Sequence, residues 1–321
     1  MITHASLFSG IGGAELAAAW MGWENLFHCD INPFGLQVLR YWFPNSIEYN
    51  DIKNTDFTPW RGRVDVLTGG FPCQCFSLSG RRRGRDDDRY LWPEMCRAIR
   101  EIQPRYVVGE NVVGILSMVE LEKERVVADA PSLFDPSRDI RTVTYRFTTE
   151  RIMSDLEACG YAVQPFVIPS VAIGAPHVRE RVWFIARRTP DTHGTGRGEG
   201  ESQGVQGDKD GSYSVKDQLH GVPRGGGSPR TSPEAVMSEP RPIPTFGGFQ
   251  DFPTKSPLCG GDDGLPDGVA DRPIFNGEFS KWRTEAVKAL GNAWCPQVAM
   301  EIFRAREADA ALSLTAKNGT A

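Results

Sequence analysis

The chain has 321 residues, of which 40% are hydrophobic and 24% charged, and its formal net charge at pH 7 is -5. This length suits one large domain plus a smaller one. No apolar run reaches the roughly 20 residues of a membrane span, and no basic stretch precedes an apolar one at the start. We therefore expect a cytoplasmic protein. The acidic balance argues against a nonspecific coat for nucleic acid, but an enzyme needs only one basic face.

The seven cysteines form no recognisable metal or disulfide pattern. Their number is odd, their spacing is irregular, and neither a Cys-x-x-Cys pair nor a histidine cluster of zinc-binding type occurs. We expect reduced thiols and no metal.

The first residues predict a strand at 5–8, a tight glycine turn at 9–13 and a helix at 14–21. Glycines let the backbone approach a ligand, and a helix N-terminus offers free N–H groups. The third glycine of the dinucleotide fingerprint is missing, which disfavours a nicotinamide-dependent oxidoreductase.

Two acidic residues follow the next predicted strands. Asp30 ends a strand at 26–30, ahead of a helix at 33–41, and a carboxylate there can accept both hydroxyls of a ribose. Asp51 follows a strand at 46–49, and it can accept a hydrogen bond from an adenine amino group or, alternatively, cap a turn.

A thiol follows the strand predicted at 64–68. Cys73 comes after Gly69 and Gly70, at the carboxyl end of that strand, where open α/β sheets bind ligands. A nucleophilic thiol needs a lowered pKa, and nearby cations provide one. The alternative is a buried structural cysteine. The cations are Arg81, Arg82, Arg83 and Arg85, in a run that could also be a solvated loop.

The middle of the chain predicts a helix at 93–101, a buried strand at 106–112, a helix at 150–159 and strands at 163–168 and 181–186. Glu110 lies near the end of its strand, where burial would raise its pKa enough for a general acid. Arg179 and Arg181 would face one side if extended. Residues 120–142 resemble a charged insertion, to which we assign no function, and their prolines oppose a continuous helix.

The C-terminal part changes composition. Residues 189–234 are dense in Gly, Ser, Pro and charge, which predicts mobility. Residues 239–282 carry enough aromatic residues for a small irregular domain, and 298–311 suit a closing helix.

Residues 71–77 read Phe-Pro-Cys-Gln-Cys-Phe-Ser, which resembles the nucleophile motif of the cytosine carbon-5 DNA methyltransferases. The other motifs of that family appear in order at 7–13, 50–52, 110–112, 174–181 and 288–293. The chain departs from the pattern at Ser6, where an aspartate is usual, and at His177, where a glutamine is usual.

The resemblance implies an α/β fold, with a Rossmann-like S-adenosylmethionine-dependent methyltransferase sheet and a small irregular target-recognition domain. The implied domains are a catalytic and cofactor-binding domain at 1–187 completed by 284–311, a target-recognition region at 188–283 with the mobile segment at 189–234, and a tail at 312–321.

The resemblance also assigns site residues. The implied catalytic residues are Cys73, Glu110, Arg179 and Arg181. The implied residues for S-adenosyl-L-methionine are Phe8, Gly10, Gly12, Asp30, Ile31, Asp51, Ile52, Pro72, Leu91 and Asn292. The implied DNA-binding residues are Ser77, Arg81, Arg82, Arg83 and Arg85.

By this resemblance, a monomer methylates carbon-5 of a cytosine flipped out of double-stranded DNA. Two alternatives stay open: a transfer RNA cytosine methyltransferase, although its Cys-Phe-Thr sequence is absent, and a catalytically silent DNA-binding relative. The target sequence and any cognate restriction endonuclease cannot be inferred.

Overall fold

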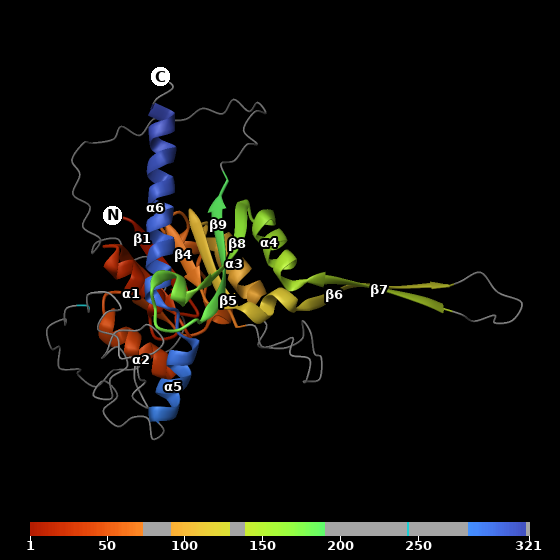
Figure 1. Cartoon of the computed structure of the whole chain (residues 1–321), viewed down its shortest axis with the longest axis horizontal. Helices are drawn as coiled ribbons and strands as arrows, with labels where there is room; N and C mark the ends of the chain where they lie inside the picture. Colours follow the sequence, from red (N-terminus) through yellow and green to blue (C-terminus); the bar gives the residue numbers. More distant parts are fainter. Residues whose placement is uncertain (73–90, 129–138, 190–242, 244–281, 319–321) are drawn as a thin grey trace, which may run out of the picture.

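A seven-stranded sheet with the order β3-β2-β1-β4-β5-β9-β8 forms the centre of the molecule (Figure 1). The computed structural model describes residues 1–72, 91–128, 139–189, 243 and 282–318. Strands β1 to β5 of this sheet pair in parallel, whereas β9 runs antiparallel to both β5 and β8. The strands are β1 (Thr3–Leu7), β2 (Glu24–Cys29), β3 (Ile47–Tyr49), β4 (Val66–Gly69), β5 (Tyr106–Val112), β8 (Tyr161–Pro169) and β9 (Glu180–Arg188).

Helices surround this sheet and explain why its central strands are almost wholly buried. Every residue of β4 and the first six of β5 are buried, as in parallel sheets covered on both faces. The helices are α1 (Gly13–Trp20), α2 (Pro33–Trp42), α3 (Trp92–Ile102), α4 (Thr148–Ala158), α5 (Trp282–Asn292) and α6 (Pro296–Asn318). Short 3₁₀ turns are η1 (Ile52–Asn54), η2 (Thr58–Trp60), η5 (Val113–Ser117) and η6 (Ser170–Ile173).

The two faces of the sheet have separate apolar cores. Val66 packs in the same core as Trp294 and Phe303, whereas its neighbour Leu67 packs in the core that contains Met95 of α3. Successive residues of a strand point to opposite faces, so β4 contributes to both cores. The α/β prediction is confirmed. The small irregular domain expected from the sequence falls outside the described residues.

The C-terminal helices pack against the N-terminal part of the chain. Helix α6 lies against α1, and α5 lies against α2. The Trp23 ring stacks on Phe303 with 4.6 Å between centroids, and Trp23 Nε1 donates to Glu307 Oε1 at 2.7 Å. This packing agrees with a C-terminal segment that completes the first domain. The boundaries stay predictions, because 190–281 lie outside the described residues except for Ile243.

The segment expected to be an insertion forms the antiparallel hairpin of β6 (Val119–Ala128) and β7 (Asp139–Phe147). It projects away from the body of the molecule (Figure 1). The sequence argued against a continuous helix here, and the two strands confirm that prediction. The sequence did not predict that β6 and β7 would pair. Helix α5 was also not predicted.

Candidate active site

The carboxyl ends of the parallel strands bring most of the described candidate residues to one edge of the sheet. Leu7 pairs with both Cys29 and Gly69, and Gly69 pairs in turn with Gly109. The turns after β1 to β4 and the end of β5 therefore lie side by side. This is the edge at which open α/β sheets bind ligands.

The glycine turn after β1 has a backbone that ordinary residues rarely adopt. Phe8, Gly10 and Gly12 have φ angles of 55°, 59° and 91°. A Cβ at Gly10 would meet no atom within 4 Å, whereas a Cβ at Gly35 would lie 2.3 Å from the Gly10 carbonyl oxygen. Helix α2 thus packs directly under the turn, and the other side of Gly10 is open. A positive φ at Phe8 carries strain, which is found often at ligand sites.

Asp30 ties this turn to the start of α2. Its Oδ2 accepts from the backbone N–H of Gly10 and its Oδ1 from that of Asn32, both at 2.7 Å. Burial raises the pKa of Asp30, and these backbone hydrogen bonds work in the opposite direction. A carboxylate has about four lone-pair sites, so it keeps capacity for ribose hydroxyls. Beside it, Ile31 is 74% exposed and open to a ligand.

Asp51 caps the turn η1. Its Oδ1 accepts from the backbone N–H of Lys53 at 2.9 Å, and its Oδ2 accepts from Asn54 Nδ2 at 2.6 Å. The sequence allowed two roles for Asp51, capping a turn or accepting a hydrogen bond from adenine, and the structure shows the cap. The remaining lone pairs still allow the second role. The next residue, Ile52, is buried.

Glu110 and Arg181 form an ion pair at the end of β5. The register places Arg181 opposite Val112, so its guanidinium lies diagonal to Glu110 on the same face. Arg181 Nε lies 2.9 Å from Glu110 Oε1. Burial raises the pKa of Glu110 from 4.5 to about 7, although Arg181 and Arg179 act to lower it. This carboxyl can therefore both hold and release a proton near neutral pH.

Arg179 does not alternate with Arg181 along one extended strand. Strand β9 begins at Glu180, and Arg179 has a φ of 20°. Its Nη2 donates to the carbonyl oxygens of Gly291 at 2.9 Å and Ala293 at 2.6 Å. Arg179 thus holds the backbone on either side of Asn292, the exposed last residue of α5.

Trp294 was not identified from the sequence, yet it joins three parts of the site. It is 6% exposed and packs edge-on against Trp183. A Cβ at Gly70 would lie 2.6 Å from Trp294 Nε1 and 3.4 Å from Glu110 Oε2, and one at Gly13 would lie 2.7 Å from the Trp294 carbonyl oxygen. Adjacent glycines indicate a close approach, but the sequence could not show that this tryptophan is what approaches.

Six of the predicted site residues lie outside the described residues. Pro72 is the last residue described before them, and Leu91, the first described after them, directly precedes α3. The six are Cys73, Ser77, Arg81, Arg82, Arg83 and Arg85.

Within the described ranges, no helix combines the length and apolar character needed to cross a membrane. The same ranges hold no group of three or more His, Cys, Asp or Glu side chains that could bind a metal ion. Four of the cysteines lie there, at 29, 96, 159 and 295, and all are free thiols.

The fold and its carboxyl edge define an α/β protein with a Rossmann-like, mostly parallel sheet. Residues 2–130 match the family model described as C-5 cytosine-specific DNA methylase. Over this region the chain is similar to that family.

Two bacterial relatives have similar sequences. The type II methyltransferase M.Eco47II of Escherichia coli is 33% identical over 192 residues, which are 58% of this chain and 39% of the relative. M.PspPI of a Psychrobacter species is 42% identical over 186 residues, 57% of this chain and 39% of the relative. The chain thus spans about two fifths of the length of these relatives.

A solved structure of a DNMT2 variant from Spodoptera frugiperda is 21% identical, with a TM-score of 0.44. That match covers 62% of this chain and 54% of the other.

Proposed function

We propose that this chain transfers a methyl group from S-adenosyl-L-methionine to carbon-5 of a cytosine flipped out of double-stranded DNA. The observation that carries the proposal is the ion pair of the buried Glu110 with Arg181, with burial raising the pKa of that carboxyl to about 7. It lies beside Gly70, three residues before Cys73. The match of residues 2–130 to the family model of C-5 cytosine-specific DNA methylases supports the same chemistry.

The turn after β1 fits an adenosine. The open space at Gly10, the Asp30 carboxylate and the exposed Ile31 together offer room, an acceptor for hydroxyls and an apolar surface. S-adenosyl-L-methionine, when bound, supplies an electrophilic methyl group. The residues proposed to hold it are Phe8, Gly10, Gly12, Asp30, Ile31, Asp51, Ile52, Pro72, Leu91 and Asn292.

Cytosine carbon-5 is a poor nucleophile until a group adds across the ring double bond. In our proposal the Cys73 thiolate adds to carbon-6, and Glu110 shares its proton with ring nitrogen 3. Arg181 orients Glu110 and donates to the base carbonyl. Carbon-5 would then take the methyl group that the cofactor supplies, and loss of the carbon-5 proton would reform the ring double bond and expel the thiolate. Base stacking covers carbon-6 in a duplex, so the base must first be flipped out at a cost of a few kcal/mol.

Duplex DNA that contains 5-fluorocytosine tests this mechanism, because fluorine cannot leave as a proton does and the adduct with the thiol persists. With S-adenosyl-L-methionine present, we expect a covalent adduct with the wild-type chain and with Cys75→Ala, but not with Cys73→Ala. If wild type binds DNA and forms no adduct, the silent relative is favoured. A parallel assay with transfer RNA separates the RNA alternative.

The remaining parts of the proposal concern the whole protein. We propose that it acts as a cytoplasmic monomer, and that 188–283 recognise the target sequence. The arginines at 81–85 and Ser77 are proposed to contact the DNA backbone, where charge attraction is strongest.

A further inference from the structure

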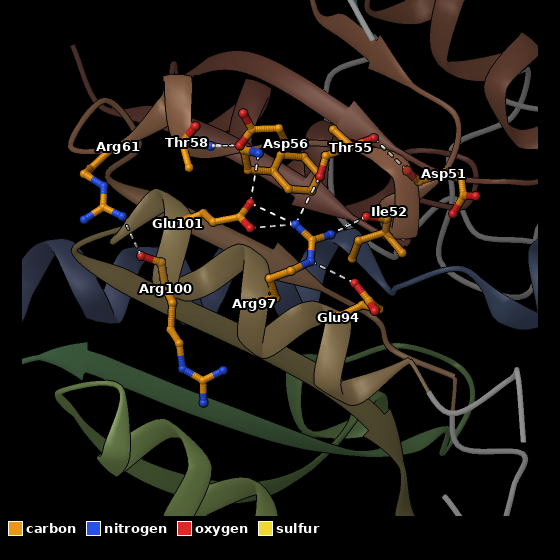
Figure 2. A network of polar contacts seen from close by, with 11 residues as sticks. Asp51, Ile52, Thr55, Asp56, Thr58, Arg61, Glu94, Arg97, Arg100 and Glu101 are labelled. Atoms are coloured by element: carbon orange, nitrogen blue, oxygen red, sulfur yellow. Dashed lines mark hydrogen bonds and ion pairs between the residues drawn. The ribbon is translucent and has the colours of Figure 1, made fainter. Parts of the chain in front are cut away.

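Arg97 of α3 holds the turn that contains Asp51 and Ile52. Its Nη2 donates to the Ile52 carbonyl oxygen, and its Nη1 donates to that of Thr55 at 3.1 Å (Figure 2). Two backbone carbonyls of one short segment therefore depend on a single side chain from a distant helix.

Two glutamates of the same helix hold the guanidinium in place. Arg97 Nε donates to Glu94 Oε2 at 2.9 Å, and Nη1 donates to Glu101 Oε1 at 2.7 Å. Residues three and four apart share a face of a helix, so α3 directs all three side chains towards the turn. A guanidinium suits this position because it has five donors in a rigid plane.

The same helix also binds the far end of the turn. Glu101 Oε2 accepts from the backbone N–H of Phe57 at 2.9 Å, and the Arg97 guanidinium lies 6.0 Å from the centre of the Phe57 ring. Inside the turn, Thr55 Oγ1 donates to the Asp51 carbonyl oxygen at 2.6 Å. Contacts from α3 thus reach Asp51 through Ile52 and Thr55.

We propose that Arg97 is a positioning residue that sets Asp51 and Ile52 against the adenine of the cofactor. This inference rests on the proposed function, in which Asp51 accepts a hydrogen bond from the adenine amino group. Arg97 touches neither cofactor nor DNA. It acts by fixing the backbone from which the Asp51 carboxylate projects. Without it the Thr55 carbonyl loses the Arg97 donor, and the Ile52 carbonyl keeps only the longer hydrogen bond from the Thr55 N–H, at 3.5 Å.

The experiment measures how well the chain discriminates between two cofactor analogues that differ only in their base. S-adenosylhomocysteine carries the amino group that Asp51 would accept, whereas S-inosylhomocysteine carries a carbonyl there. Calorimetric titration of the full chain with each compound gives a ratio of dissociation constants. We expect wild type to prefer the adenine compound, and Arg97→Met to reduce that ratio about tenfold, equivalent to ~1.4 kcal/mol.

Arg100→Met is the matched control, because Arg100 lies on the same helix and its side chain points away from the turn (Figure 2). It should keep the wild-type ratio. Arg97→Lys keeps the charge between Glu94 and Glu101, so it should fold even if the Met variant does not. Its single ammonium donates less well to two carbonyls, and we expect an intermediate ratio.

A folded Arg97→Met or Arg97→Lys variant with the wild-type ratio would overturn the inference. A change equal for both compounds would overturn it as well, because it would indicate general destabilisation. If wild type binds neither compound, the proposed cofactor is wrong and the inference fails with it. If wild type binds both compounds and the Arg97 variants keep its ratio of dissociation constants, the proposed function stands and Arg97 has no positioning role.

Discussion

The Asn111 side-chain amide donates a 2.9 Å hydrogen bond to the carbonyl oxygen of Phe71, two residues before the proposed nucleophile. Asn111 is 4% exposed and follows Glu110 directly, so one strand end carries the proposed acid and fixes the backbone that leads to Cys73. The Asn111 Oδ1 accepts from the N–H of Val112, which determines how the amide is oriented.

Asn111→Ala should therefore slow chemistry more than it weakens cofactor binding. We expect kcat to fall about tenfold, and the free energy of unfolding to fall by about 1–2 kcal/mol, because a buried carbonyl loses its donor. Asn25→Ala, on β2, is the control, since it also removes a side-chain amide donor to a backbone carbonyl, that of Glu15 in α1. Stopped-flow adduct formation measures the chemical step, and urea unfolding measures the free energy of unfolding. Equal loss of kcat in both variants would contradict the prediction.

Gly70→Ala should destabilise the chain, because the added methyl would lie 2.6 Å from Trp294 Nε1. Overpacking of this kind costs about 1–3 kcal/mol. Trp294→Phe removes the crowded ring nitrogen, so the double variant should recover part of the loss relative to the sum of the two single changes. Gly114→Ala is the control, since a Cβ there meets no atom within 4 Å. Thermal unfolding that shows equal effects at Gly70 and Gly114 would refute the prediction.

The raised pKa of Glu110 predicts a specific dependence on pH. Folded Glu110 keeps its proton up to about pH 7, whereas the unfolded chain loses it near 4.5. Between these values the folded state binds more protons, so the free energy of unfolding falls as pH rises, by about 3 kcal/mol at most.

Glu110→Gln should lack that contribution and should reduce kcat about a hundredfold. Wild-type kcat should decline above about pH 7, where the proposed acid loses its proton. Paired urea titrations and rate profiles from pH 5 to 8 test both statements. A Gln variant with the wild-type pH dependence of stability would show that Glu110 does not titrate in this range.

The two arginines should have separable effects. Arg179→Ala removes the donor to the Gly291 and Ala293 carbonyls, so we expect KM for the cofactor to rise about tenfold with kcat nearly constant. Arg181→Ala removes the partner of Glu110, so we expect kcat to fall instead. Both arginines lower the pKa of Glu110, Arg181 more than Arg179, so the loss of Arg181 should move the alkaline decline of kcat further to higher pH. Steady-state kinetics that give one pattern for both variants would contradict this assignment.

The sequence alone determined most of the local elements of the first 187 residues and the order of the site residues. Strands such as β5 are buried runs rich in β-branched residues, and Pro33, with its fixed φ, marks the start of α2. Such signals are local, because they depend on a residue and its near neighbours. The placement of Glu110 near a strand end followed from the same signals.

Only the tertiary structure decided which residues far apart in the chain meet. Nothing local to Trp294 predicts that it lies against Gly70 and Gly13, and nothing near Arg97 predicts that it holds Ile52 and Thr55. Arg179 and Arg181 are two positions apart, yet one binds carbonyls of the last segment and the other binds Glu110. These contacts depend on strand pairing and helix packing across long separations, which hydrophobic periodicity does not encode.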